Sequence, residues 1–248
     1  MSVSALKFTL SGKSAFFKKP DVNEKVYFTY NNIHRVALLG ILGAIIGLEG
    51  NKNYHLFREK VPNYPEYYTK LNSLRISIVP NAQRGYFSKK TQYFNNSTGF
   101  ASQEEGGNLM VREQWLNNPS WTIYLLQGDT ESTVWNKLCD YLLQEKCVYY
   151  PYLGKNDFPA IIRECSMVEL SKGEYSHIDS IFYGELDMVS DYSASEELPY
   201  VFCEISPYGL IKTYNFYQMK RSIFTNYELK STEGLMLLSY NDQILCFN

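Results

Sequence analysis

Residues 33–48 read IHRVALLGILGAIIGL and are apolar on nearly every side of a helix. A helix that lacks a polar face is buried against other elements rather than lying on the surface. The apolar run from 36 to 48 holds 13 residues, which is too short for a helix that spans a bilayer. Its three glycines lower helix propensity but leave a flat stripe that can approach a sheet closely. The stretch therefore predicts a central helix, from about Ile33 to Leu48, that is packed on a sheet.

Two asparagines and a basic pair stand at the start of this helix. Asn31 or Asn32 can act as the N-cap. His34 and Arg35 then fall in the first turn, where free backbone N–H groups favour an anion. His34 could instead act as a general base that removes the proton of a ribose 2′-OH, with Tyr30 or a Lys assisting. A structural interpretation is also open, in which His34 only caps the helix and Arg35 lies on the surface.

Hydrophobic periodicity predicts further elements on both sides of the central helix. Before residue 150 it predicts strands at 5–10, 74–79, 86–94, 109–116 and 121–126, and helices at 64–71 and 130–145. The second of these helices can be capped by Asp129 or Thr130. The order strand, helix, strand, hairpin, strand, helix indicates an α+β, ferredoxin-like unit with a long protruding hairpin at about 81–116.

The second part of the chain is predicted to be almost entirely strand. The predicted strands span 160–168, 178–186, 200–205, 210–217, 222–229 and 235–247. We therefore expect a domain at 1–150 that carries the hairpin, and a β-rich C-terminal subdomain at 151–248 packed on it.

The net charge of −2 at first argues against a nucleic-acid-binding protein. The charge is unevenly distributed, because residues 1–100 hold 14 Lys and Arg against 5 Asp and Glu, a balance of +9. Residues 101–248 hold 10 Lys and Arg against 21 Asp and Glu, a balance of −11. Such asymmetry predicts a basic surface for a polyanion and an acidic surface that faces solvent or a partner protein.

The cysteines and the start of the chain indicate a cellular compartment. Five cysteines form no C-x-x-C pair, and an odd number favours free thiols in a reducing cytosol. Residues 1–7 lead directly into a strand-like segment and carry no apolar signal core. We expect a soluble, cytoplasmic protein.

Basic and aromatic side chains interleave in two segments of the basic half. Ammonium and guanidinium groups bind phosphates, and aromatic rings stack on unpaired bases. The candidates in the loop after the first strand are Lys13, Phe16, Lys18 and Lys19. Those on the predicted hairpin are Arg84, Lys89, Lys90 and Arg112, with Tyr93 and Phe94 between them. The alternatives are a solvated loop with two rings in the core, and a solubilising strand edge.

Other chemistry has little support in the sequence. Phosphate-loop, nucleophile-elbow and zinc-protease motifs are absent from the sequence. His34, His55 and His177 lie far apart, without the spacing of metal ligands. We expect no metal and no cofactor.

Seven strings, taken together, resemble the CRISPR-associated Cas-five family, and in particular its type I-B form. They lie at 6–13 (LKFTLSGK), 15–20 (AFFKKP), 34–45 (HRVALLGILGAI), 64–68 (YPEYY), 94–97 (FNNS), 105–109 (EGGNL) and 111–116 (VREQWL). The resemblance covers residues 4–126, about half of the chain, and the leucine-glycine helix at 38–44 is its most specific string.

The resemblance implies a fold, a complex and a ligand. It implies a ferredoxin-like, RNA-recognition-motif-like (RRM-like) domain of the RAMP superfamily with a protruding thumb hairpin. It implies one copy per Cascade antiviral surveillance complex, capping the backbone beside the backbone and large subunits and gripping the 5′ handle of the CRISPR RNA. Carried onto this sequence, the handle contacts are Lys13, Lys18, Lys19, Tyr30, His34, Arg35, Arg84, Lys89, Lys90 and Arg112, with Phe16 available for base stacking.

One branch of the family, in type I-C systems, cleaves precursor CRISPR RNA with a Tyr and an adjacent Lys-His pair. In this sequence no Lys directly precedes His34, His55 or His177. We therefore expect a non-catalytic RNA-binding subunit. Two alternatives stay open: a metal-independent endoribonuclease that processes precursor CRISPR RNA, and a protein scaffold without direct RNA contact.

Overall fold

The computed structural model describes residues 2–21, 26–50, 64–95, 103, 105, 110–193, 197–212 and 214–248. His55 and most of the predicted hairpin tip, residues 96–109, lie outside the described residues.

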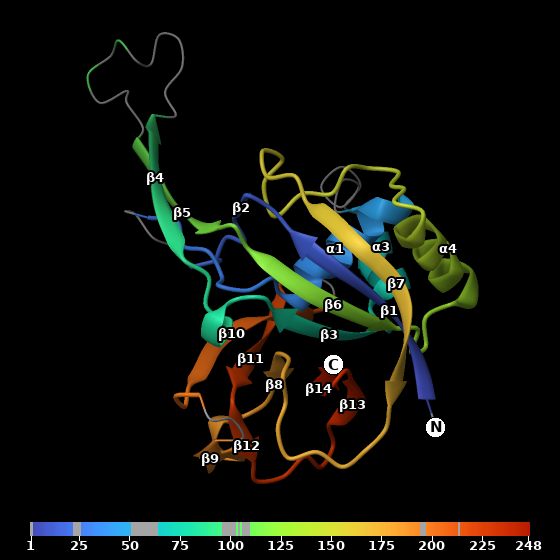
Figure 1. The fold of residues 1–248 in the computed structure, drawn as a ribbon. Helices are drawn as coiled ribbons and strands as arrows, with labels where there is room; N and C mark the ends of the chain where they lie inside the picture. Colours follow the sequence, from blue (N-terminus) through green and yellow to red (C-terminus); the bar gives the residue numbers. More distant parts are fainter. Residues whose placement is uncertain are drawn as a thin grey trace.

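An antiparallel sheet forms the centre of the described structure (Figure 1). Its strands, in spatial order, are β14 (Gln243–Phe247), β13 (Met236–Tyr240), β7 (Ile161–Ser171), β1 (Ser2–Ser11), β6 (Ser120–Leu126) and β3 (Arg75–Pro80). The predicted alternation of β1 is confirmed, because Leu6, Phe8 and Leu10 are fully buried while Lys7 and Thr9 are partly exposed. The sheet thus combines strands from both ends of the chain.

Helices cover one face of this sheet. They are α1 (Arg35–Ile46), α3 (Glu66–Leu71) and α4 (Ser132–Leu143), and their apolar side chains join those of β1, β3 and β6 in one core cluster. Helix α1 is buried on almost every side, as its sequence predicts. At Gly43 a Cβ atom would lie 2.5 Å from Cβ of Tyr67 in α3, so only glycine lets the two helices approach so closely.

The other face of the sheet carries a smaller apolar cluster. It includes Ala5 and Val168 of the central strands together with Leu238, Leu245 and Phe247 of the β13–β14 hairpin. The prediction of a mixed α+β chain, rich in strand and with few helices, is confirmed.

The helix starts differ from the predictions. His34, not Asn31 or Asn32, is the N-cap of α1, because its Nδ1 accepts a hydrogen bond from the backbone N–H of Ala37. Helix α4 begins after Glu131, whose side chain makes no cap bond, rather than after Asp129 or Thr130. Cap residues depend on local backbone geometry, which hydrophobic spacing does not determine.

Smaller sheets complete the C-terminal part. One contains β10 (Val201–Leu210), β11 (Tyr217–Thr225) and β8 (Phe182–Tyr183), and another contains β9 (Val189–Ser193) and β12 (Tyr227–Leu229). The strand predicted at 210–217 is wrong, because these residues largely form the turn between β10 and β11, with Asn215 in a left-handed conformation at φ 54°. The strand predicted at 178–186 is much shorter in the structure, where only β8 forms, and the short 3₁₀ turn Leu186–Met188 follows it.

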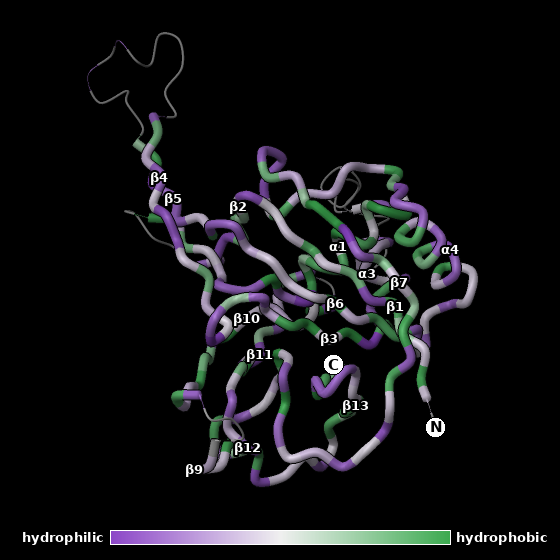
Figure 2. The backbone as a smooth tube through the Cα atoms, viewed as in Figure 1, coloured by the Kyte–Doolittle hydropathy of each residue, from purple (hydrophilic) through white to green (hydrophobic). Residues whose placement is uncertain are grey.

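A third small sheet extends away from the body at the upper left of Figure 1. It contains β2 (Ser14–Ala15), β5 (Met110–Asn117) and β4 (Lys89–Asn95), and β4 pairs with β5 from Lys89↔Leu116 to Asn95↔Met110. Figure 2 shows that most of β4 is hydrophilic. The 3₁₀ turn Gln83–Gly85 leads from β3 into this β4–β5 pair. In the part of the chain that the structure describes, no helix is long and apolar enough to cross a membrane.

Candidate nucleic-acid interface

Backbone hydrogen bonds join the basic loop after β1 to the β4–β5 pair. Residues 16–19 and 28–30 run antiparallel, with Lys19 N–H donating to Phe28 O at 2.9 Å and Tyr30 N–H donating to Phe17 O at 2.9 Å. Tyr27 continues onto β5, because its N–H donates to Arg112 O at 2.9 Å. These bonds bring the lysines of the loop and the cations of the β4–β5 pair into one region.

The rings of the loop point inward and its cations point outward. Phe16 and Phe17 are about 95% buried, so the prediction that Phe16 stacks on an RNA base is corrected: its ring belongs to the core. Lys13 and Lys18 are exposed, and Lys19 is partly exposed. The ammonium group of Lys18 lies 3.7 Å from the centroid of the Tyr27 ring, an arrangement that holds a cation at the surface without neutralising it.

The two asparagines before α1 hold the turn that carries Arg84. Asn31 Nδ2 and Asn32 Nδ2 both donate to Gly85 O, at 2.8 and 3.1 Å, and Trp121 Nε1 donates to Asn32 Oδ1 at 3.0 Å. Gly85 has φ +68°, and a Cβ atom there would lie 2.4 Å from Cδ1 of Phe224. The turn is therefore fixed on several sides, and it leaves Arg84 exposed.

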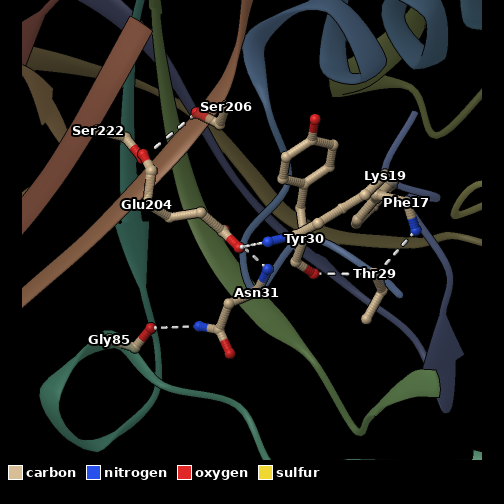
Figure 3. Close-up of polar contacts among 9 residues, drawn as sticks. All are labelled: Phe17, Lys19, Thr29, Tyr30, Asn31, Gly85, Glu204, Ser206 and Ser222. Atoms are coloured by element: carbon tan, nitrogen blue, oxygen red, sulfur yellow. Dashed lines mark hydrogen bonds and ion pairs between the residues drawn. The ribbon is translucent and has the colours of Figure 1, made fainter. Parts of the chain in front are cut away.

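Glu204, which the sequence analysis did not select, lies within this basic region (Figure 3). Its carboxylate accepts from Lys19 Nζ at 2.8 Å and from the backbone N–H of Asn31 at 2.9 Å. Ser222 Oγ donates to the backbone carbonyl of Glu204 at 2.8 Å and fixes its place on β10. The charge of Glu204 also affects Lys89. Burial lowers the pKa of Lys89, the negative charge of Glu204 opposes this shift, and the positive charge of Lys19 adds to it.

The two faces of the β4–β5 pair differ, because neighbouring residues of a strand point to opposite faces. One face carries Lys90, Gln92 and Phe94 opposite Trp115, Glu113 and Val111. The other carries Lys89, Thr91 and Tyr93 opposite Leu116, Gln114 and Arg112. Lys89 and Lys90, each predicted as an RNA contact, therefore lie on opposite faces of the pair.

Lys155 closes part of the first face. Its ammonium lies 2.7 Å from Glu113 Oε2 and within 5.4–5.7 Å of the ring centroids of Phe16, Phe94 and Trp115. Trp115 Nε1 donates to the same carboxylate oxygen at 2.7 Å. Lys155 therefore fastens the β4–β5 pair to the body from this side.

The second face is open to solvent at its outer end, away from Leu116, which is fully buried. The guanidinium carbon of Arg112 lies 5.2 Å from the centroid of the Tyr93 ring, which is 56% exposed. Thr91 is also exposed on this face. A cation, an aromatic ring and a hydroxyl are thus presented together, and proteins use these groups to contact phosphates and unpaired bases.

His34 is enclosed rather than available at a surface. It is 5% exposed, and the rings of Phe17, Tyr30 and Tyr217 surround it at centroid distances of 5.4–6.1 Å. Burial lowers the pKa of His34 to about 3, so the ring is neutral at physiological pH. The prediction of a phosphate contact at His34 is therefore corrected to a cap at the start of α1. Burial also raises the pKa of Tyr30, which is 1% exposed and has no open surface for RNA.

Arg35 is buried too, which excludes both the predicted anion contact and a surface position. Its guanidinium donates to Asn72 Oδ1 at 2.7 Å and to the carbonyls of Asn72 and Leu74. The side chain thereby holds the turn between α3 and β3, and burial lowers its pKa. Of the predicted contacts, seven side chains keep some exposure: Lys13, Lys18, Lys19, Arg84, Lys89, Lys90 and Arg112.

The described residues contain no group of three or more His, Cys, Asp or Glu side chains that could hold a metal ion. All five cysteines are described, and each is a free thiol.

Comparison with known proteins gives a likeness in structure alone. No family model matches the chain, and a search of curated proteins finds no match. A solved chain titled "CRISPR RNA-guided surveillance complex" aligns over 91% of both chains at 9% identity, with a TM-score of 0.50. The two chains share a fold. A CRISPR protein from Archaeoglobus fulgidus aligns over 98% of both chains at 10% identity with a TM-score of 0.49.

Proposed function

We propose that this chain is a non-catalytic CRISPR RNA-binding subunit of a type I, I-B-like Cascade complex. In this role a single copy caps the backbone of the complex in the cytoplasm and grips the 5′ handle of the RNA. The proposal is supported by the seven strings that resemble the Cas-five family and by the fold shared with a chain of a CRISPR RNA-guided surveillance complex.

The strand order supports the ferredoxin-like interpretation. The elements β1, α1, β3, β6, α4 and β7 follow one another as strand, helix, strand, strand, helix, strand. Four of the strands lie side by side in the order β7-β1-β6-β3, which is the arrangement of the ferredoxin-like motif. On this interpretation the unit extends through β7, beyond the boundary proposed at residue 150, and the β4–β5 pair is the base of the thumb.

The observation that carries the RNA proposal is the set of cations around this base. Lys13, Lys18, Arg84 and Arg112 are exposed and come from three separate segments: the loop after β1, the turn before β4, and β5. Backbone hydrogen bonds join the loop through residues 27–30 to β5, and Asn31 and Asn32 hold the turn that carries Arg84. Tyr93 and Phe28, 56% and 40% exposed, can stack on unpaired bases beside the cations. This combination suits a hooked single strand better than a duplex, whose bases are already stacked.

His34 gives little support to the endoribonuclease hypothesis. A general base must reach the proton that it removes. His34 is buried, and its Nδ1 is used by the backbone of α1. The hypothesis predicts cleavage of repeat RNA in EDTA with a 2′,3′-cyclic phosphate end, and loss of that cleavage in His34→Ala. RNA that stays intact after long incubation with pure protein would reject it.

The RNA proposal is tested with the purified chain and a labelled handle RNA at several salt concentrations. The variant Arg84→Gln/Arg112→Gln should weaken binding and flatten the slope of log K against log salt by about 0.7 for each phosphate contact that is lost. Lys137→Gln/Lys172→Gln is the matched control, because it removes two exposed positive charges outside the interface. Equal slopes for the two variants would show that the interface is misplaced.

The scaffold hypothesis is distinguished by crosslinking. Ultraviolet irradiation of the complex should attach RNA to residues 13–19, 84–94 or 110–116 if the proposal is correct. An RNA that crosslinks only to other subunits would favour the scaffold instead.

A further inference from the structure

Glu204 places a negative charge inside the cluster that is proposed to bind phosphate. It belongs to β10, in the acidic part of the chain, and its side chain is 11% exposed. Its two carboxylate oxygens are used separately: Oε1 accepts from Lys19 Nζ at 2.8 Å, and Oε2 accepts from the backbone N–H of Asn31 at 2.9 Å (Figure 3).

These two donors form the kind of site that an RNA phosphate occupies. An ammonium group and a backbone N–H are standard partners of phosphate oxygens. Lys89 adds a second cation within electrostatic range of Lys19 and Glu204. Lys19 is 28% exposed, so solvent and RNA can reach the cluster from the lysine side.

We propose that Glu204 competes with the RNA backbone for Lys19. The inference rests on the proposed RNA-binding function and adds a residue that tunes it. In the free protein the carboxylate occupies Lys19, and a phosphate gains this lysine only by displacing the carboxylate. Glu204 therefore weakens binding to any single strand at this position, and the contacts of Arg84 and Arg112 must supply the remaining affinity.

The test uses the full chain, a fluorescently labelled oligouridylate and a salt series. Glu204→Gln keeps an oxygen that can accept from Asn31 N–H but removes the charge that holds Lys19. We expect about fivefold tighter binding at low salt, because Lys19 no longer has to leave a carboxylate before it pairs with a phosphate. We also expect a salt slope that is steeper by about 0.7, because Lys19 then makes one more phosphate contact.

Two further variants make the test specific. Glu185→Gln is the matched control, because it also removes one negative charge but pairs with Arg221 and not with Lys19. It should leave the slope unchanged. In a Lys19→Gln background, Glu204→Gln should give no gain, because the competition needs Lys19.

The outcomes separate this inference from the proposed function. If the wild-type chain binds the RNA but Glu204→Gln binds equally or more weakly, Glu204 positions Lys19 rather than competing for it, and the inference is overturned. If neither protein binds RNA, the proposed function and the inference both fall. If Glu204→Gln melts below the assay temperature, the RNA affinity of Lys19→Gln tests the inference instead. Its loss of affinity should be smaller than that of Arg84→Gln, and an equal loss would contradict competition.

Discussion

Replacing glycine by alanine at two positions of the central helix should change the stability of the fold in opposite directions. In Gly40→Ala the new methyl group would meet no atom within 4 Å, whereas in Gly43→Ala it would lie 2.5 Å from Cβ of Tyr67. Gly40 lines a groove of about 670 Å³ beside α1, so there is room for the added carbon. Both positions lie inside Arg35–Ile46, and the gain in helix propensity is therefore the same at each.

The magnitudes follow from these distances. Replacing glycine by alanine within a helix stabilises it by about 0.5–1 kcal/mol. Gly40→Ala should therefore raise the free energy of unfolding by about that amount. At Gly43 the same gain is opposed by overpacking against α3, which costs about 1–3 kcal/mol, and the net effect should be a loss of up to about 2 kcal/mol.

Urea unfolding, followed by far-ultraviolet circular dichroism, measures the difference. The two variants should share one m-value, and their midpoints should move in opposite directions. The separation between them should equal the overpacking cost, about 1–3 kcal/mol, because the gain in helix propensity is common to both. If Gly43→Ala is as stable as Gly40→Ala, the contact between α1 and α3 is not as close as described, and the explanation of the glycine stripe is wrong.

Three further predictions concern polar groups. The folded-state pKa of His34 is about 3, below the ordinary value of about 6.5, so the unfolded chain takes up a proton first as the pH is lowered. The free energy of unfolding should therefore decrease as the pH falls from about 6.5 to about 3, by up to about 1.4 kcal/mol per pH unit. The decrease should be less steep in His34→Asn. Lys155→Met leaves the carboxylate of Glu113 without its cation, and thermal melts should show a loss of folding stability of about 1–2 kcal/mol. This loss is smaller than for a fully buried ion pair, because the Lys155 side chain is 28% exposed. That cost should largely disappear when Glu113→Gln is also present. Asn32→Ala removes the acceptor of Trp121 Nε1 and a donor to Gly85 O, so it should cost about 2–3 kcal/mol in denaturant titrations and weaken RNA binding through Arg84.

The parts of the fold that sequence periodicity predicted are those that depend on neighbouring residues. The all-apolar stretch gave α1, and strict alternation gave β1, because each pattern reflects burial of a regular element. The arms of the β4–β5 pair were predicted for the same reason. The strand expected at 210–217 failed, because an apolar run there spans a turn whose geometry depends on Asn215.

The candidate site was harder to predict, because its geometry depends on residues far apart in the sequence. The spacing of Phe16, Phe17, Lys18 and Lys19 does not show which side chains enter the core. Arg35 looked like a surface cation, but its partners, Asn72 and Leu74, lie more than 35 residues away. Glu204 is separated from Asn31 by 173 residues, and no local pattern could have selected it.

The charge distribution of the sequence also needs a different interpretation. A balance of +9 before residue 100 and −11 after it suggested one basic and one acidic surface. In the folded chain, Glu204 from the acidic part pairs with Lys19 of the basic part, whereas Lys155 and Glu113 both come from the acidic part and pair with each other. An acidic residue of the second part therefore lies among the cations of the first, and the two parts do not form two separate charged surfaces. What a phosphate can use is the set of cations that no carboxylate holds, and for this reason the salt slope, which counts such contacts, tests the interface more directly than any sum of charges.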